Sequence, residues 1–299
     1  MTEAFCSQIS LSAGEPLAGS AVANTDRWIA IEHPVAWGPI GLEDSALPEA
    51  VLTLLGDLAR RFPRLRVQLV RPERARERQS TRVWFAECGD QPALYALELP
   101  NLEAFGQLAL DAWLRGEGPP PGARESQPLY LVCVHGKRDR CCALLGLPVY
   151  RALAGLVGER VLQTTHLGGH RFAATLLTLP AGICYGRVLP DEAAPLVAAT
   201  EAARLHDLSR VRGRVAYGSE AQAAEVTLRE RLGETRADAL TLLSSARAED
   251  GTFVVRFAER ATGTEHQVQL AREAMPPMPQ SCGAAPKPAK RLVSLQAPE

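Results

Sequence analysis

The sequence predicts an α/β protein made of two halves with a similar order of elements, followed by a small C-terminal α+β appendage. The chain has 299 residues, of which 46% are hydrophobic and 22% charged, and its formal net charge is −1. This composition is typical of a folded chain, because disordered chains are poorer in apolar residues and carry more net charge. At about 100–200 residues per domain, the length fits two domains. The segment 116–127, GEGPPPGARESQ, is expected to be a linker, because consecutive prolines fit neither a helix nor an inner strand.

The elements on the two sides of this linker are expected in the same order: strand, helix, strand, hairpin and helix. In the first half, hydrophobic periodicity and turn residues predict them at 28–32, 48–62, 66–70, 83–87 with 93–99, and 101–114. In the second half, the corresponding segments are 129–134, 142–157, 161–165, 175–179 with 183–188, and 191–205. This is the thioredoxin-like order, so we predict thioredoxin-like domains at 1–115 and 128–208. Ordinary α/β halves whose order coincides by chance are the alternative.

Helical positions carry the clearest local signals. In the first half, Val51, Leu54, Leu55 and Leu58 fall on one face of the first helix. Asn101 is expected to cap the last helix of that half. In the second half, Pro148 is expected to tighten or kink the first turn of its helix.

Residues 209–299 form the predicted appendage. Ser219 and Gln222 are spaced as in a capping box, which starts a helix that runs to about residue 232. The remaining segments expected here are a hairpin, from 252–257 and 266–270, and a proline-rich loop or extended tail, at 275–290.

Several classes of protein are excluded by the composition and by the N-terminal residues. No basic residue precedes Arg27, so the N-terminus lacks the positive region of a secretory signal. It also has no apolar run long enough for the core of such a signal, so we expect none. No run of about 18 apolar residues is free of charge, so we expect no membrane span. The net charge gives no basis for nucleic-acid binding. Seven cysteines, an odd number, do not suggest a disulfide framework, so we expect a reducing, cytoplasmic location where cysteines are metal ligands, redox groups or buried hydrophobes.

Two segments carry the residues expected to do chemistry. The first runs from Cys133 to Gly146, CVHGKRDRCCALLG, and leads from a strand through a charged loop into a helix. The second, HLGGHRF, begins at His166 and follows the next strand. Because both strands of a parallel β-α-β unit end at the same edge of the sheet, the two segments are expected to converge there.

The converging residues form a candidate metal site of two thiolates and two imidazoles. Cys133 and Cys142 are expected to meet His166 and His170. Gly168 and Gly169 allow a tight turn, so that both histidines can face the same point. Such a set suits either zinc or an iron–sulfur cluster. Structural zinc sites usually space their cysteines by about two to four residues, whereas eight residues separate these two, which suits the wider [2Fe–2S] cluster better.

Neighbouring residues are weaker candidates. His135 could donate a hydrogen bond to the site, be an alternative ligand or be a solvated loop histidine. Arg138 and Asp139 could form an ion pair, hold the loop by hydrogen bonds or be a solvated charged run. Arg171 could raise a reduction potential and meet an acidic partner, or form a surface salt bridge. Cys141 is expected to be a packing residue or spare thiol. The other cysteines are expected to be passive, because none has a partner at useful spacing: Cys6, Cys88, Cys184 and Cys282.

The runs VCVHGKRDRCCALLG and THLGGHRFAATLLTLPAGICYGRVLPDEA resemble the sucrase/ferredoxin-like family of thioredoxin-like proteins. They also look like the thioredoxin-like [2Fe–2S] ferredoxins, whose second segment has Cys-x-x-x-Cys where this chain has His166 and His170. The resemblance covers roughly 128–205, and the stretches CSQISLSAGEPLAGSA and WIAIEHPVAWG extend it to the bacterial members over the whole chain. Yeast relatives are described as non-Rieske [2Fe–2S] proteins with two histidine ligands.

The resemblance implies a ferredoxin-type second half in which Cys133, Cys142, His166 and His170 hold a [2Fe–2S] cluster. The family pattern Cys-Ala-x-x-Gly aligns with Cys142, which favours it over Cys141 as the ligand. Two imidazoles in place of two thiolates make the oxidised cluster neutral instead of doubly negative, so its reduction potential should exceed that of four-cysteine ferredoxins. Reduction should also be coupled to proton uptake at an imidazole.

The sequence therefore favours an electron carrier that serves an unidentified redox partner protein, rather than an enzyme with its own substrate. A zinc-stabilised binding module of the same fold is the alternative. A thiol oxidoreductase is disfavoured, because the chain contains no Cys-x-x-Cys. The "sucrase" in the family name finds no support in the sequence, which shows no positioned pair of carboxylates.

Overall fold

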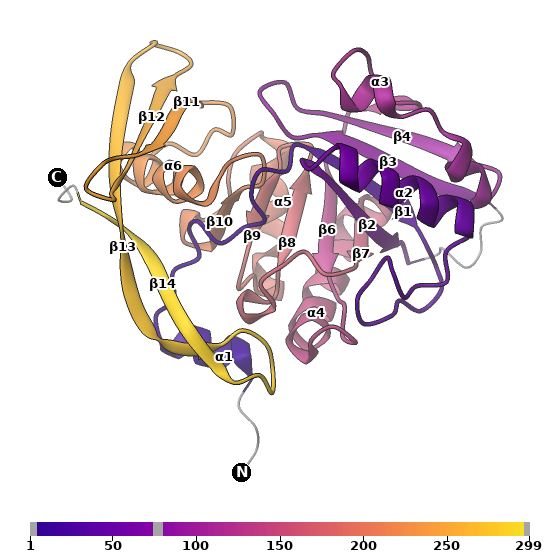
Figure 1. Ribbon diagram of the computed structural model, residues 1–299, viewed down its shortest axis with the longest axis horizontal. Helices are drawn as coiled ribbons and strands as arrows, with labels where there is room; N and C mark the ends of the chain where they lie inside the picture. Colours follow the sequence, from indigo (N-terminus) through magenta and orange to yellow (C-terminus); the bar gives the residue numbers. More distant parts are fainter. Residues whose placement is uncertain (1–4, 74–79, 296–299) are drawn as a thin grey trace.

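The computed structural model describes residues 5–73 and 80–295. Its centre is a ten-stranded mixed sheet in the order β10-β9-β8-β6-β7-β2-β1-β3-β4-β5, and a four-stranded antiparallel sheet, β11-β12-β13-β14, lies beside it (Figure 1). The helices are α1 Cys6–Ser12, α2 Glu49–Arg61, α3 Asp111–Leu114, α4 Arg140–Val157, α5 Ala193–Glu201 and α6 Ser219–Leu232. The α/β fold class is confirmed.

The strands of the large sheet are β1 Arg27–Glu32, β2 Leu65–Arg71, β3 Thr81–Glu87, β4 Ala93–Leu99, β5 Ala123–Glu125, β6 Leu129–Cys133, β7 Val161–Thr164, β8 Leu176–Leu179, β9 Ile183–Tyr185 and β10 Val211–Arg214. Those of the smaller sheet are β11 Leu240–Arg247, β12 Phe253–Glu259, β13 Glu265–Pro279 and β14 Pro286–Ser294.

The two halves of the chain have the same pairing pattern. In the first, β1 pairs with β2 in parallel and with β3 antiparallel, and β4 pairs with β3. In the second, β6, β7, β8 and β9 repeat these relations. Both halves thus have the thioredoxin-like order, and the antiparallel pairing of β2 with β7 joins them into one continuous sheet.

The helices α2, α4 and α5 pack on one face of the large sheet. Val51 of α2, Leu153 of α4 and Leu196 of α5 belong to the same buried core as alternate residues of the strands. The opposite face is covered by loop residues, including Ala21 and Leu167, and its core contains Cys133 and Cys142. Both cysteines therefore belong to the core on this second face of the sheet.

Two expectations about the domain boundaries are corrected by the structure. Within the predicted linker, β5 pairs with β4, so this part of 116–127 is an edge strand. The strand β10, which was assigned to the appendage, pairs with β9 and completes the large sheet.

The predicted helix at 101–114 is also interrupted. Asn101 accepts a hydrogen bond from the N–H of Ala104 as expected, but a short 3₁₀ helix, Glu103–Gln107, is followed by extended chain before α3. A Cβ at Gly106 would lie 3.1 Å from the Cβ of Ala50 in α2. Close packing of this turn against α2 therefore overrides the helical pattern.

The region 275–290 is not a loop, because most of it belongs to the long β13–β14 hairpin. Beyond Leu270, β13 pairs only with β14, so its other edge is free of a neighbouring strand. Prolines are tolerated on such an edge because their nitrogen atoms carry no hydrogen to donate. A register shift between Met275 and Met278 accommodates the two prolines between them. The hairpin reaches α1, so segments near the two ends of the chain lie side by side (Figure 1).

The helix α6 connects the smaller sheet to the large one. Its apolar residues, including Ala224 and Leu228, pack on β12 and β13. On its other side, buried Glu225 pairs with Arg229 at 2.9 Å and with Arg214 of β10 at 3.0 Å. The appendage is therefore attached to the large sheet by a buried ion network as well as by apolar contacts.

One stretch of the described residues, Arg140–Arg160, is long and apolar enough to cross a membrane by length and composition alone. This is weak support for a membrane span, since a core helix passes the same test. Its helical part, α4, packs on β6 and β7 and buries Val149 and Leu153 against the sheet.

Candidate metal centre

Cys133 and Cys142 lie at the edge of the sheet where β6 ends and α4 begins. Cys133 is the last residue of β6, and Cys142 is in the first turn of α4. The side chain of Asp139 caps α4 by accepting a hydrogen bond from the N–H of Cys141 at 2.8 Å. A Cβ at Gly146 would lie 2.2 Å from the carbonyl oxygen of Cys133, so glycine is needed for α4 to approach the strand end.

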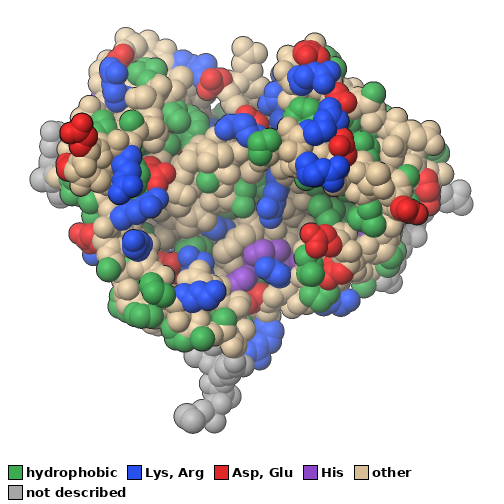
Figure 2. Space-filling model, viewed as in Figure 1, with side chains coloured by type: hydrophobic (Ala, Val, Ile, Leu, Met, Phe, Trp, Pro, Cys, Tyr) green, Lys and Arg blue, Asp and Glu red, His purple; other side chains and the backbone are tan. Residues whose placement is uncertain are grey.

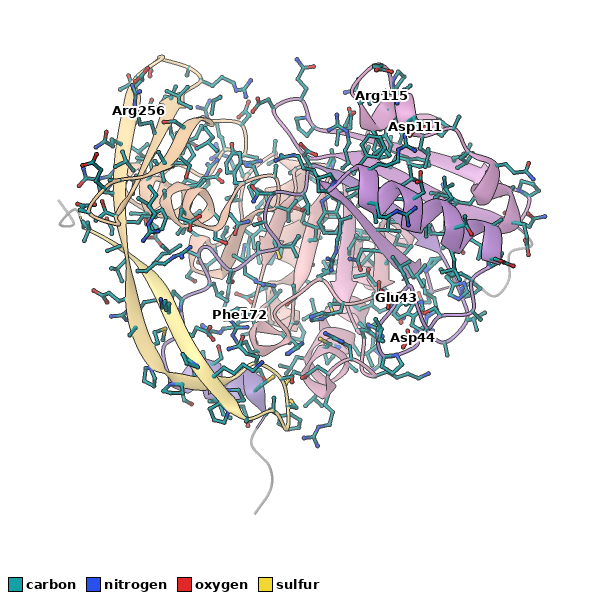
Figure 3. The ribbon with its side chains drawn as sticks, viewed as in Figure 1. Glu43, Asp44, Asp111, Arg115, Phe172 and Arg256 are labelled. Atoms are coloured by element: carbon teal, nitrogen blue, oxygen red, sulfur yellow. The ribbon has the colours of Figure 1, made fainter. Side chains whose placement is uncertain are left out.

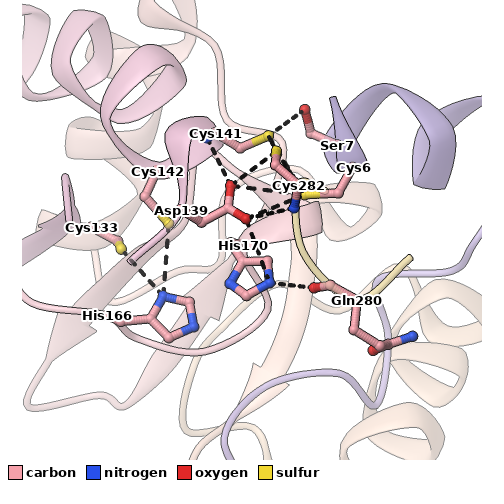
Figure 4. Close-up of polar contacts among 10 residues, drawn as sticks. All are labelled: Cys6, Ser7, Cys133, Asp139, Cys141, Cys142, His166, His170, Gln280 and Cys282. Carbon is pink, nitrogen blue, oxygen red and sulfur yellow. Dashed lines mark hydrogen bonds and ion pairs between the residues drawn. The ribbon is translucent and has the colours of Figure 1, made fainter. Parts of the chain in front are cut away.

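The two histidines reach the same place from the loop after β7. Gly168 and Gly169 have φ values of +92° and +68°, which confirms the tight turn expected between the histidines. Nδ1 of His166 lies 3.8 Å from Sγ of Cys133 and 3.7 Å from Sγ of Cys142 (Figure 4). The structure therefore brings three of the four expected ligands together, with all donor atoms within 4.8 Å of one another.

His170 lies beside this group. Its ring stacks on that of His166, with 4.9 Å between the ring centroids and 29° between the planes. Nε2 donates a hydrogen bond to the carbonyl oxygen of Gln280, because a carbonyl can only accept. Nδ1 is buried and has no hydrogen-bond partner among the described residues. We call Cys133, Cys142, His166 and His170 the thiol–imidazole group.

The protonation of this group is set by mutual contacts and burial. A hydrogen bond from Cys142 is the main cause that holds the pKa of Cys133 well below its usual value, and the proximity of His166 adds to it. The same hydrogen bond and burial raise the pKa of Cys142. Of the two cysteines, Cys133 is therefore the one that loses its proton more readily. Burial lowers the pKa of His170, which favours the neutral imidazole that a metal ligand requires.

Arg212 of β10 is an important neighbour that was not predicted. Its guanidinium is buried and donates to the carbonyl oxygens of Gly168, at 2.9 Å, and Ser20. It also lies 5.1 Å from the ring centre of Phe172, at the strand ends of the second half (Figure 3). Sequence spacing gives no signal for this residue, because it lies more than 40 positions from His170 and belongs to a strand that was assigned to the appendage.

The first half of the chain also contacts the site loop. His135 is 2% exposed and donates from Nε2 to the carbonyl oxygen of Gly38 at 2.7 Å, while Trp37 packs edge-on against its ring. The interpretation of His135 as a solvated histidine is therefore wrong. Asp139 is likewise buried rather than solvated, and holds the loop by hydrogen bonds, whereas Arg138 is exposed.

A second group of thiols shows that Cys6 and Cys282 do have partners, which their spacing in the sequence did not suggest. Sγ of Cys141 lies 3.6 Å from that of Cys6 and 3.4 Å from that of Cys282, and the last two are 3.6 Å apart. Asp139 touches all three residues (Figure 4). Hydrogen bonding from Cys6 is the main cause that lowers the pKa of Cys141 to about 6. We call Cys6, Asp139, Cys141 and Cys282 the three-cysteine group; Cys88 and Cys184 are buried apart from it.

The N-terminal segment holds the histidine loop from outside. Arg171 donates to both carboxylate oxygens of Glu15 at 2.9 Å, and this carboxylate also accepts from the Ser10 hydroxyl at 2.7 Å. The expected alternative of a salt bridge at Arg171 is therefore correct as to the ion pair. It is wrong as to the surface location, because Glu15 is only 5% exposed. These contacts belong to the CSQISLSAGEPLAGSA stretch, to which sequence reasoning gave no role.

The thiol–imidazole group is accessible through its histidines. His166 and His170 are partly exposed, whereas Cys133 and Cys142 are buried. Figure 2 shows histidine side chains in a hollow on one face of the molecule, with Lys and Arg side chains near them. The imidazole edges are therefore the part of the group that solvent or another molecule can reach.

Comparisons with known proteins assign the chain to a family. A segment of the chain is similar to altered inheritance of mitochondria protein 32 of Meyerozyma guilliermondii, with 30% identity over 82 residues. The similarity covers 24% of this chain and 29% of that protein. No solved structure matches the chain. The family model described as sucrase/ferredoxin-like matches residues 22–213, which include the whole thiol–imidazole group. The chain therefore belongs to the sucrase/ferredoxin-like family.

Proposed function

We propose that the chain is a one-electron carrier in which Cys133, Cys142, His166 and His170 hold a [2Fe–2S] cluster. The convergence of these side chains carries the proposal. Two thiol sulfurs face Nδ1 of His166 at 3.8 and 3.7 Å, and a second imidazole stacks on the first. Clusters ligated by two cysteines and two histidines are an established class of electron-transfer centre.

The unpaired nitrogen of His170 supports its role as the fourth ligand. A buried polar atom without a partner is unfavourable, so the orphaned Nδ1 calls for a partner. The carbonyl oxygen of Gln280 fixes the proton on Nε2 and leaves the lone pair on Nδ1. Ligand histidines are usually held in this way through their second nitrogen.

When bound, the cluster would accept and release single electrons. The chain favours acceptance by two features: neutral imidazoles replace two thiolates, and the guanidinium of Arg212 is buried behind the histidine loop. Arginine remains charged even when burial lowers its pKa, as it does here. We therefore expect a reduction potential above that of four-cysteine ferredoxins.

The charges near the exposed imidazoles favour a redox partner protein with an acidic surface. Lys137, Arg138 and Arg140 are exposed in the loop and first turn between the two ligand cysteines. Such a cationic rim would steer an acidic partner toward the histidines, and association would slow as ionic strength rises. A basic partner would contradict this part of the proposal.

A zinc-stabilised binding module is the second candidate, and one observation favours it. The donor atoms of Cys133, Cys142 and His166 lie within 4.8 Å of one another, which is compact enough for a single tetrahedral ion. The two candidates differ in colour and electron count, because zinc has no redox chemistry.

Purification of the full chain under anaerobic conditions tests the proposal. We expect visible absorption, two iron and two sulfide per chain, and an electron paramagnetic resonance signal on reduction. Cys133→Ala should lose all three, and Cys88→Ala, at a buried cysteine outside both groups, should keep them. Colourless protein whose zinc is lost in Cys133→Ala would instead establish the zinc module.

The cellular location stays a prediction. The name of the yeast relative refers to mitochondria, whereas the sequence alone favours the cytoplasm. All seven cysteines are free thiols, which is the state expected in a reducing compartment. Fractionation of cells expressing the chain at its native level would distinguish the two locations.

A further inference from the structure

The three-cysteine group is assembled from segments far apart in the chain. Cys6 begins α1, Cys141 is in the first turn of α4, and Cys282 lies in the turn between β13 and β14. Cys6 and Cys282 lie outside residues 22–213, the range that matches the family model. The group therefore joins the two ends of the chain to the loop that carries the thiol–imidazole group.

The sulfur atoms form a nearly equilateral triangle, with edges of 3.6, 3.4 and 3.6 Å. A disulfide would require about 2.05 Å, so no pair is bonded. A tetrahedral ion with zinc–sulfur distances of about 2.3 Å places its sulfur ligands about 3.8 Å apart. The triangle is therefore close to the face that three thiolates present to one zinc ion.

Asp139 supplies a fourth donor on the same side. One carboxylate oxygen lies 3.3 Å from Sγ of Cys282, and both lie 3.9 Å from Sγ of Cys6. All four donor atoms fall within 4.8 Å of one another. Backbone N–H groups of Cys141 and Cys282 donate to the two oxygens at 2.8 and 2.9 Å, which fixes the orientation of the carboxylate.

The charge balance also calls for a cation at this point. Asp139 is 5% exposed, and Cys6 and Cys141 are 1% and 0% exposed. Among the residues that the structure describes, the ion-pair partner of this carboxylate is the imidazole of His170, at 3.8 Å, and burial favours the neutral form of that ring. Burying a carboxylate beside three thiols without a neighbouring positive charge destabilises the fold. A bound divalent ion would supply that positive charge.

We propose that Cys6, Cys141 and Cys282, with Asp139, bind a structural zinc ion that is separate from the cluster. The ion pins α1 and the β13–β14 turn against the start of α4. It thereby also fixes Gln280, two residues before Cys282, whose carbonyl oxygen holds His170. The site stands on its own donors and does not depend on the identity of the cluster.

Zinc analysis of the full chain tests this site. We expect one zinc per wild-type chain, removed in Cys282→Ala and Cys141→Ala but kept in Cys88→Ala and Cys133→Ala. Iron and sulfide should remain in Cys282→Ala. Zinc that is lost in Cys133→Ala and kept in Cys282→Ala would overturn the proposal and assign zinc to the thiol–imidazole group, so the two proposals fail separately.

Thiol alkylation of the wild-type chain avoids reliance on variants that fail to fold. With zinc bound, peptides containing Cys6 and Cys282 should resist alkylation, and a chelator should make both reactive. Unchanged reactivity on zinc removal, or a disulfide between any two of the three cysteines in freshly purified protein, would overturn the proposal. X-ray absorption at the zinc edge should show three sulfur ligands and one oxygen; a nitrogen in place of the oxygen would overturn the role of Asp139.

Discussion

The two groups proposed to bind metal differ in how the chain builds them, although adjacent residues, Cys141 and Cys142, contribute to one each. The thiol–imidazole group comes from a single β-α-β unit and the loop that follows it. The three-cysteine group also needs α1 and the β13–β14 turn, from near the two ends of the chain. The first can therefore be inferred from spacing and topology, whereas the second becomes visible only in three dimensions.

Helical geometry explains why neighbouring cysteines separate. Successive residues of an α-helix point in directions about 100° apart, since about 3.6 residues make one turn. Cys142 therefore faces the sheet core with Cys133, and Cys141 faces α1 with Cys6 and Ala173. A single helical turn can in this way serve two sites of different composition.

The largest effect on metal content should come from replacing each of these two neighbouring cysteines in turn. Cys142→Ala is expected to lose all iron and visible absorption but keep the zinc, while Cys141→Ala is expected to lose the zinc and keep the iron. Each loss follows from removal of one ligand from a four-ligand set. Metal analysis and absorption spectra of both variants measure it, and parallel loss of both metals in both variants would refute the separation.

His170→Cys should lower the reduction potential by on the order of 100 mV or more, because a thiolate adds negative charge to the cluster. Potentiometric titration followed by electron paramagnetic resonance measures the shift. His206→Gln, at a histidine outside both groups, is the matched control. An unchanged potential in His170→Cys would exclude His170 from the ligand set.

The potential should also fall as pH rises through the pKa of a ligand imidazole in the oxidised state. The reduced form then takes up a proton that the oxidised form has lost, and a one-electron, one-proton couple changes by about 59 mV per pH unit. This slope should disappear in the double variant His166→Cys, His170→Cys. A flat profile in the wild type would contradict histidine ligation.

The smallest effect concerns the stability of the metal-free chain. Burial lowers the pKa of His33, His135 and His170. Below the ordinary histidine value of about 6.5, the unfolded chain therefore binds more protons than the folded one, and stability falls as pH falls. We expect a loss of about 1–2 kcal/mol between pH 7 and pH 5.5, measured by denaturant unfolding. His33→Gln should reduce this loss, and greater stability at the lower pH would contradict the sign.

The sequence was sufficient for features that local chemistry controls. Hydrophobic periodicity located most strands and helices, and the Gly168–Gly169 turn was correctly predicted from two residues that tolerate positive φ. It was insufficient where distant packing decides. The β13–β14 hairpin could not be predicted, because its prolines indicate a loop unless the pairing with a second strand is known. Arg212 could not be predicted, because only the pairing of β10 with β9 brings it to the histidine loop.

Nitrogen hyperfine spectroscopy of the reduced, anaerobically purified protein tests the central claim most directly. The thiol–imidazole assignment predicts two strongly coupled nitrogens on a [2Fe–2S] centre, with one lost in His170→Cys and one in His166→Cys. A reduced centre without strongly coupled nitrogen, or protein that contains zinc but no iron at Cys133 and Cys142, would contradict it.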